Sequence, residues 1–159
     1  MQFLFFAALV FIVYFNALGN GFVSDDRGII ASVATPFQFS TNIRAILIFF
    51  TNQLFGLNPF FFRLPNILAH LGSVFLIYFI VRKLSGKLTA IFAAAIFAVH
   101  PILTEGVTWI SGGGYSLYTF FLLASFFVYM HWQQKKYFIF SVFLFYLSLL
   151  SSEKAIAFP

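Results

Sequence analysis

Long apolar runs separated by short polar segments dominate this chain. A transmembrane helix needs about 20 predominantly apolar residues, and each run reaches about that length once flanking Ser, Thr, Gly and Tyr residues are included. The pattern therefore predicts an all-α fold, a multi-pass bundle of about five transmembrane helices. The runs cover residues 3–18, 60–81, 88–103, 115–130 and 137–150.

The segment between the first two runs, residues 19–59, has a different pattern. Glycines break the apolar sequence at its start, and residues 20–45 are the least hydrophobic stretch of the chain. Residues 43–57 mix apolar side chains with Arg44, Thr51, Asn52 and Gln53. Such a mixture is typical of a helix that lies in the membrane interface. We therefore predict a first outer loop over about residues 19–59 that contains an interfacial helix.

The composition agrees with a membrane protein. Hydrophobic residues make up 62% of the 159 residues and charged residues 8%, and the mean hydropathy is +0.97. Soluble domains are about 45–50% apolar and about 25% charged. A soluble, disordered or collagen-like chain is thereby excluded, and no residues are left over for a soluble domain. The absence of cysteine excludes a disulfide scaffold and thiolate chemistry.

The distribution of charge predicts the orientation of the bundle. Two short loops carry lysine and arginine without any acid, at residues 82–87 and 133–136. By the positive-inside rule both are cytoplasmic, which also places the N-terminus inside. All four acids then fall on the outer side, at Asp25, Asp26, Glu105 and Glu153. The net charge of +5 is not gathered on one basic face, so no nucleic-acid partner is predicted.

Asp25 and Asp26 follow the first apolar run directly and have two interpretations. Aspartate at a helix start caps free backbone N–H groups. A carboxylate at the membrane surface can also act as a catalytic base or hold a divalent cation against a phosphate. Two adjacent acids are too few ligands for a dedicated metal site, so the sequence requires no cofactor.

Other polar residues on the outer side are also candidates for a site. Arg63 can reach lipid headgroups or bind a lipid-linked phosphate. His100 and Glu105 are five residues apart with a proline between them, which does not match a zinc motif. Hydrogen bonding near a substrate pocket is the alternative for both. Residues 112–114, three glycines, form either a phosphate cradle or a flexible turn.

An ordered set of short motifs resembles a known family of membrane enzymes. Residues 62–70 and the basic loop after them resemble the second span of polytopic glycosyltransferases with the type-C fold. Residues 100–105, HPILTE, and 109–112, WISG, resemble the transmembrane O-mannosyltransferases that carry tetratricopeptide repeats, and their prokaryotic relatives. Residues 150–155 resemble a later stretch of these proteins, and residues 22–26 lie where the family has its first-loop acidic motif.

The resemblance implies transfer of a sugar from a polyprenyl-phosphate carrier to a protein or glycan acceptor at the outer or luminal membrane face. The role of the base acting on the acceptor would fall on Asp25 or Asp26. We expect the substrate and its phosphate to be bound by Arg63, His100, Glu105, Glu153 and Lys154. Of these, Arg63, His100 and Glu105 are expected to line the same outer cavity as the base. The implied location is the cell membrane in a prokaryote and the endoplasmic reticulum membrane in a eukaryote.

The chain also departs from this family. The family often has an arginine where this chain has Gly113, and a lysine where it has Ser152, with Lys154 displaced by two positions. The family also has many more spans, so we expect residues 1–159 to be the N-terminal part of a longer protein. A non-catalytic membrane scaffold is the alternative function. A transporter is less favoured because the acids lie at the ends of spans.

Overall fold

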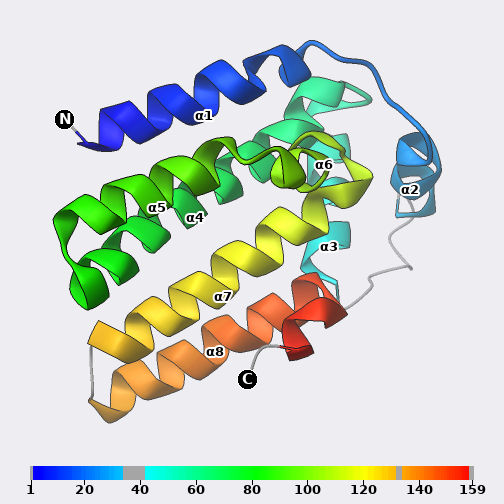
Figure 1. The fold of residues 1–159 in the computed structure, drawn as a ribbon. Coiled ribbons are helices and arrows are strands. Elements are labelled where there is room, and N and C mark those ends of the chain that lie inside the picture. The colour runs from blue at the N-terminus through cyan, green and yellow to red at the C-terminus, as the bar shows by residue number, and fades with distance from the viewer. Residues whose placement is uncertain (1, 34–41, 132–133, 158–159) are drawn as a thin grey trace.

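The computed structural model describes residues 2–33, 42–131 and 134–157, and every regular element within these ranges is a helix (Figure 1). The all-α prediction is thereby confirmed for the described part of the chain. The elements are α1 (Gln2–Leu18), α2 (Asp26–Ser32), α3 (Ile43–Phe55), α4 (Pro59–Ser85), α5 (Lys87–Val99), η2 (Pro101–Leu103), α6 (Thr104–Thr108), η3 (Ser111–Gly113), α7 (Gly114–His131), α8 (Lys135–Ser151) and η4 (Glu153–Ala157).

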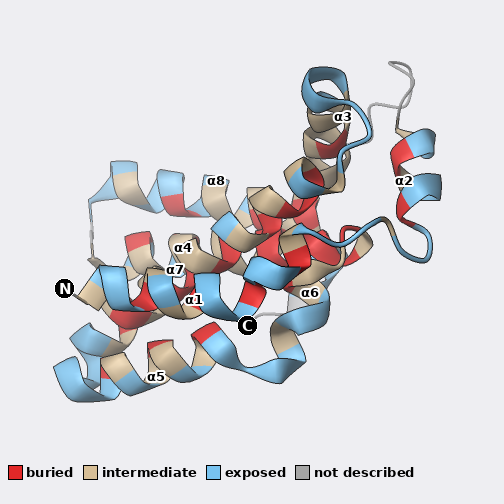
Figure 2. Ribbon diagram, turned by 90° about the horizontal axis from the view of Figure 1, so that it is seen from above, coloured by how far each residue is buried: buried red, intermediate tan, exposed pale blue. Residues whose placement is uncertain are grey.

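The five longer apolar helices α1, α4, α5, α7 and α8 lie side by side with roughly aligned axes (Figure 1). Helix α4 contacts α1, α5 and α7, and α7 contacts α8. The main core forms between α1, α4 and α5, where Ala90, Ala94 and Ala98 have no exposed surface. Alanines spaced four apart form one smooth helix face, which lets neighbouring helices approach closely. Figure 2 shows buried stretches alternating with exposed ones along these helices.

The ends of the helix bundle differ in charge. The turn between α4 and α5, the end of α7 and the start of α8 lie at the same end as the start of α1 (Figure 1). Lys83 connects this turn with the end of α7, because its Nζ donates a hydrogen bond to the Met130 carbonyl. The loop after α1, the α6–η3 region and the C-terminal η4 lie at the opposite end (Figure 1). We call the first the basic end (Arg82, Lys83, Lys87, Lys135, Lys136) and the second the acidic end (Asp25, Asp26, Glu105, Glu153).

The lengths of the helices confirm fewer spans than the five predicted. Two segments are long and apolar enough to cross a membrane, Pro59–Ser85 and Ser111–His131. A third span is counted only if α5 and the bent segment Pro101–Thr108 are joined. Helix α1 has 17 residues. At about 1.5 Å per residue it measures about 25 Å, below the roughly 30 Å of a hydrocarbon core.

Helix α5 ends earlier than the predicted run of residues 88–103. It stops at Val99, and the chain continues after a bend of 49° through η2 and α6. Pro101 explains the break, because proline lacks an N–H donor and forces the preceding residue out of helical geometry. His100 accordingly has extended backbone angles, φ −66° and ψ 125°. The bend brings Glu105 back over the acidic end.

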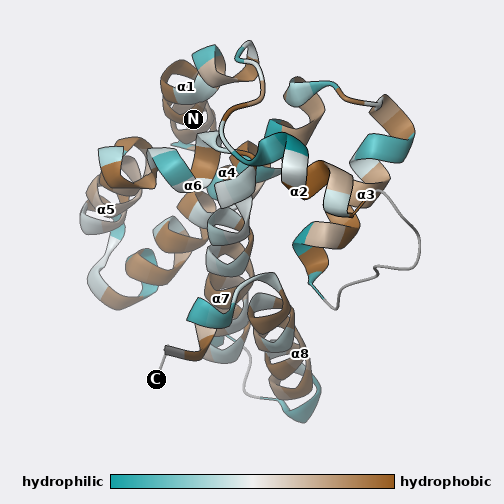
Figure 3. Ribbon diagram, turned by 90° about the vertical axis from the view of Figure 1, so that its right-hand side faces the viewer, coloured by the Kyte–Doolittle hydropathy of each residue, from teal (hydrophilic) through white to brown (hydrophobic). Residues whose placement is uncertain are grey.

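The segment predicted to form the first outer loop contains two helices among its described residues, α2 and α3. The predicted helix over residues 43–57 is present as α3, Ile43–Phe55. A small second core joins these helices to the rest through Ile30, Ile48, Phe62 and Ile110. Hydrophilic residues are most frequent at helix ends and in the segments that connect helices, whereas the helices themselves are mostly hydrophobic (Figure 3).

Candidate functional site

The adjacent acids Asp25 and Asp26 have opposite environments. Asp25 is exposed at the start of α2, and its side chain makes no capping hydrogen bond there. Asp26 is completely buried. Its Oδ2 accepts from the Val23 N–H at 2.9 Å, and its Oδ1 accepts from the N–H of Ser111 at 3.0 Å and from Ser111 Oγ at 2.9 Å. Asp25 is therefore the acid that is open to a ligand.

Residues 108–111 are held by side chains from three different helices. Arg63 Nε donates to the Thr108 carbonyl at 2.9 Å, and Asn66 Nδ2 donates to the Trp109 carbonyl at 3.4 Å. Arg44 Nη2 donates to the Ile110 carbonyl, and Asp26 accepts from Ser111. We call residues 108–111 the clamped segment. It fixes the position of the loop that connects α6 to α7.

The guanidinium of Arg63 makes hydrogen bonds to backbone groups within the protein. Arg63 is 2% exposed, and besides the bond to Thr108 its Nη1 and Nη2 donate to the carbonyls of Asn20 and Gly21. The three bonds join the loop after α1 to the clamped segment. A phosphate could bind this guanidinium only by replacing some of these backbone partners.

The glycine triplet is packed, which corrects the expectation of a flexible turn. All three glycines are buried. A Cβ on Gly112 would lie 2.7 Å from the Glu105 carbonyl oxygen, and one on Gly113 would lie 2.2 Å from Asn66 Oδ1. A Cβ on Gly114 would lie 3.1 Å from the Ser151 carbonyl oxygen. Glycine is needed here because side chains would collide with the surrounding chain.

Arg44 is a charged residue of the site. From the sequence it was identified only as part of the predicted interfacial helix. Burial lowers its pKa, while the charges of Asp26 and Asp25 and a smaller effect of Tyr115 oppose this. Its Cδ also lies 3.5 Å from the place that a Cβ on Gly114 would occupy. Arg44 thus lies between the two acids and the start of α7. A lone arginine in a helix that is otherwise mostly apolar was the signal that could have identified it.

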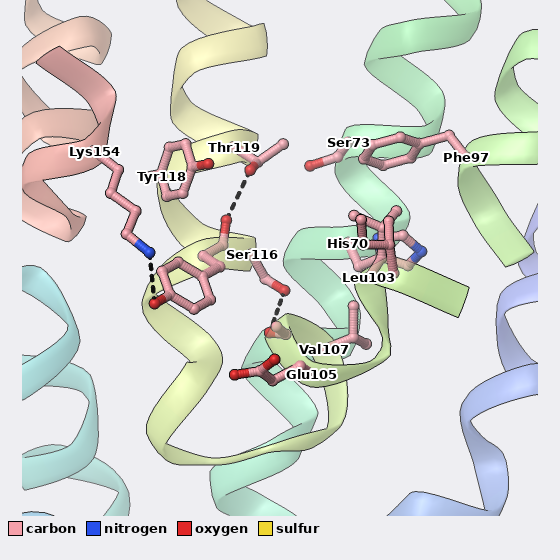
Figure 4. A pocket seen from close by; sticks show the side chains of 13 residues that line it. His70, Ser73, Phe97, Leu103, Glu105, Val107, Ser116, Tyr118, Thr119 and Lys154 are labelled. Atoms are coloured by element: carbon pink, nitrogen blue, oxygen red, sulfur yellow. Dashed lines mark hydrogen bonds between the residues drawn. The ribbon is translucent and has the colours of Figure 1, made fainter. Parts of the chain in front are cut away.

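A cavity of about 440 Å³ opens beside this arrangement (Figure 4). Most of its surface is apolar, and we call it the polar cavity after the hydroxyl and charged groups that it also contains. Its walls come from α4, α5, η2, α6, α7 and η4, and they include both the Glu105 carboxylate and the Lys154 ammonium. The residues that line it are His70, Ser73, Phe97, Ile102, Leu103, Glu105, Gly106, Val107, Tyr115, Ser116, Tyr118, Thr119 and Lys154. Hydroxyl groups, one acid and one cation suit a polar ligand that bears negative charge.

Lys154 and Tyr115 both line this cavity, and their side chains contact each other. The Nζ of Lys154 donates to the Tyr115 hydroxyl at 2.8 Å, and it lies 4.1 Å from the centroid of the same ring (Figure 4). The hydrogen bond to Tyr115 raises the pKa of Lys154, which keeps the ammonium charged. Figure 4 also shows Ser116, whose Oγ donates to the Gly106 carbonyl at 2.7 Å and so holds α6 against α7.

Two of the residues predicted for the site line the cavity described above, and His100 lines another. The polar cavity contains Glu105 and Lys154, but Asp25, Asp26, Arg63, His100 and Glu153 do not line it. His100 lines a neighbouring apolar cavity of about 370 Å³ between α4, α5 and η2. The two cavities share Phe97, Ile102 and Leu103 as walls. Glu153 is exposed in the first turn of η4.

The described residues include no group of three or more His, Cys, Asp or Glu side chains placed to hold a metal ion. Within this part of the chain the acids are arranged singly or as the Asp25–Asp26 pair. Around one end of the bundle the arrangement therefore combines exposed carboxylates, those of Asp25, Glu105 and Glu153, with the buried carboxylate of Asp26 and with cations that include Arg44 and Lys154.

Comparison with known proteins places the chain in a family. The family described as dolichyl-phosphate-mannose-protein mannosyltransferase matches residues 43–159. Two relatives come from Drosophila melanogaster. Protein O-mannosyl-transferase Tmtc2 is 36% identical over 69% of this chain, and Protein O-mannosyl-transferase Tmtc1 is 29% identical over 67% of it.

The matched regions make up 14% and 15% of these two relatives, so the chain spans about one seventh of their length. No solved structure matches the chain. The family match confirms the resemblance and covers most of the chain, including α3, α4 and the clamped segment, whereas the acidic stretch at residues 22–26 lies outside it. This chain belongs to the dolichyl-phosphate-mannose-protein mannosyltransferase family.

Proposed function

We propose that this chain takes part in the transfer of a sugar from a polyprenyl-phosphate donor to a protein or glycan acceptor at the outer or luminal membrane face. The names of the relatives favour mannose as the sugar and a protein as the acceptor. The observation that carries the proposal is the exposed Asp25 carboxylate beside a buried, fully bonded Asp26 at the acidic end.

The chemistry assigns a separate task to each charged group. The acceptor hydroxyl oxygen attacks the anomeric carbon of the sugar, and the bond between that carbon and the phosphate oxygen breaks. Of the two adjacent acids, Asp25 takes the hydroxyl proton because it is the exposed one, whereas Glu105, which is also exposed, is assigned to sugar hydroxyls in the cavity. Polyprenyl phosphate leaves with the bonding electron pair, and its negative charge needs a cation nearby.

The two cavities fit a ligand that has a polar head and an apolar tail. We assign the sugar and phosphate to the polar cavity, where Lys154 supplies positive charge and Glu105 and the hydroxyl groups supply acceptors for sugar hydroxyls. The start of the polyprenyl chain would occupy the adjoining apolar cavity, next to His100. Arg44 lies between this region and Asp25, where it would attract the phosphate.

A non-catalytic scaffold of the same fold is the second candidate function. The observation that favours it is the internal use of Asp26 and Arg63, whose polar atoms bind other parts of the chain. Under this hypothesis Asp25 would be only the residue that precedes α2, and removing its charge would leave any activity of the assembly unchanged.

The test is transfer from a polyprenyl-phosphate sugar by the protein as its gene encodes it, reconstituted in vesicles. Asp25→Asn should lower turnover by about 10²- to 10⁴-fold, the usual contribution of a general base. Arg27→Gln, an exposed change in the same helix, is the matched control and should keep turnover. Equal turnover in Asp25→Asn and the unchanged protein would favour the scaffold.

A further inference from the structure

We infer that Asp26 is a positioning residue, which fixes helix α2 and the Asp25 carboxylate against the clamped segment. The inference rests on the proposed function. It assigns the reaction to Asp25, and it assigns to Asp26 the role of holding Asp25 in position. It follows from the contacts of the two side chains rather than from their order in the sequence.

The contacts of Asp26 suit holding rather than proton transfer. Its side chain has no exposed surface, and its two oxygens accept hydrogen bonds from three donors. A general base must reach the hydroxyl that it deprotonates at about 2.6–3.2 Å. Asp26 could do so only by releasing Ser111 and leaving its burial site, which would cost the hydrogen bonds that stabilise its charge.

Helix α2 needs such a hold because it is short. It has seven residues, and isolated helices shorter than about 12–15 residues are marginal. Its apolar contribution to the core is Ile30, which packs with Ile48, Phe62 and Ile110. The Asp26–Ser111 bonds are the polar counterpart, and they act one residue away from Asp25. Without them, the direction of the Asp25 side chain would be poorly defined.

The clamped segment is a suitable anchor because it is itself held by the long helix α4. Arg63 and Asn66, both on α4, bind the carbonyls of Thr108 and Trp109. Arg44 of α3 binds the next carbonyl, that of Ile110. Ser111 follows at once, so its N–H and hydroxyl are presented to Asp26 from a fixed backbone. The chain of contacts runs from α4 through the clamped segment to Asp26 and Asp25.

The kinetic test compares three variants of the reconstituted protein. Asp26→Ala removes all three bonds and should lower kcat about 10²-fold, the scale of a misplacement of about 1 Å. Asp26→Asn keeps an oxygen for Ser111 and should recover kcat to within about tenfold of the unchanged protein, the cost of about one hydrogen bond. Ser111→Ala removes one bond and should fall between them. KM for the lipid-linked donor should stay unchanged in all three.

A distance measurement tests the positioning without relying on activity. The chain contains no cysteine, so spin labels can be attached at Gly28→Cys on α2 and Leu68→Cys on α4, both exposed. The distribution of distances between the labels should be narrow in the unchanged protein and in Asp26→Asn. It should broaden in Asp26→Ala and partly in Ser111→Ala.

The possible outcomes distinguish the positioning role of Asp26 from the proposed function of the chain. If Asp26→Asn abolishes transfer while Asp25→Asn retains it, Asp26 is the base and the inference is wrong. If Asp26→Ala leaves kcat and the distance distribution unchanged, Asp26 does not position α2. If no variant and no unchanged protein transfers sugar, the proposed function fails, but broadening of the distances in Asp26→Ala still supports the positioning role.

Discussion

Gly112 lies where the backbone of the clamped segment meets helix α6. A Cβ at this position would be 2.7 Å from the Glu105 carbonyl oxygen and 3.4 Å from the Trp109 ring. A backbone carbonyl cannot rotate away as a side chain can, so the helix itself would have to shift. Because Glu105 lines the polar cavity, such a shift would also move a wall of the proposed sugar site.

We therefore expect Gly112→Ala to destabilise the protein by about 1–3 kcal/mol, the usual cost of overpacking a tight site. The measurement is thermal unfolding in detergent, followed by the loss of monodisperse protein. Gly28→Ala is the matched control, because a Cβ there has no atom within 4 Å and the residue lies within α2. Alanine at that helical position should be neutral or stabilise by up to about 1 kcal/mol. Equal unfolding of Gly112→Ala and the unchanged protein would refute the packing argument.

The sequence indicated candidate site residues more readily than it indicated the contacts that these residues make. The adjacent acids, Glu105 and Lys154 were identified from residue type and resemblance, and two of them line one cavity. The bonds of Arg63 could not be predicted, because its partners lie 42 to 45 residues away along the chain. The division between Asp25 and Asp26 likewise depends on Ser111, which is 85 residues away from Asp26.

At the scale of elements, α7 and α8 are joined by serines within their apolar faces. Ser125 Oγ donates to the Ser141 carbonyl at 2.9 Å, and Ser141 Oγ donates to the Ser125 carbonyl at 3.0 Å. The two hydroxyls are also 3.1 Å apart. Ser148 Oγ makes a separate bond to the Tyr118 carbonyl at 2.9 Å. Small hydroxyl residues allow close approach and supply directional bonds where the surroundings are apolar.

The reciprocal pair predicts coupling between two substitutions. Ser125→Ala and Ser141→Ala should each destabilise by about 0.5–1.5 kcal/mol, and the double variant should lose less than the sum, because each removes part of the same bonded unit. Ser125→Ala combined with Ser148→Ala is the control and should be additive, since these residues share no partner. The free energy of unfolding in a detergent–denaturant titration measures both cycles. Additivity in the Ser125–Ser141 cycle would contradict this prediction.

The elements themselves were largely predictable, and their lengths were not. Every apolar run of the sequence contains a helix, because a continuous apolar run can satisfy its backbone in a membrane as a helix. Helix α5 is shorter than its run because Pro101 breaks it. Helix α4 is longer than its run, since Asn58 caps it one residue before Pro59 and the polar residues of the basic end extend it to Ser85.

At the scale of the whole molecule, the four acids all lie at one end of the bundle together with Arg27, Arg44, Arg63 and Lys154, whereas the charged residues of the other end are cations. The basic end and the acidic end are at opposite ends of the long helices, as Figure 1 shows. The positive-inside rule assigns the basic end to the cytoplasm. This orientation remains a prediction, and so does the position of α3 at the outer surface. Both follow from assigning the basic end to the cytoplasm.

Cysteine labelling in sealed cells checks the orientation directly, because the chain has no native cysteine. A membrane-impermeant reagent should label Ser24→Cys at the acidic end from outside, and should label Gln134→Cys at the basic end only after permeabilisation. Gln53→Cys, an exposed position of α3, should be labelled from outside if that helix lies at the outer surface. The reverse pattern at positions 24 and 134 would overturn the orientation and the proposed site of catalysis.

The bonding of Arg63 sets an order of events during synthesis and membrane insertion. An arginine held without partners inside a bilayer is costly, by at least about 2.5–3.5 kcal/mol. The Asn20 and Gly21 carbonyls precede Arg63 in the chain, whereas the Thr108 carbonyl follows it by 45 residues. Helix α4 can therefore enter the translocon before its guanidinium has its complete set of acceptors. The set of acceptors for Arg63 is therefore complete only once the chain has been made as far as Thr108, after α5 and α6 have followed α4.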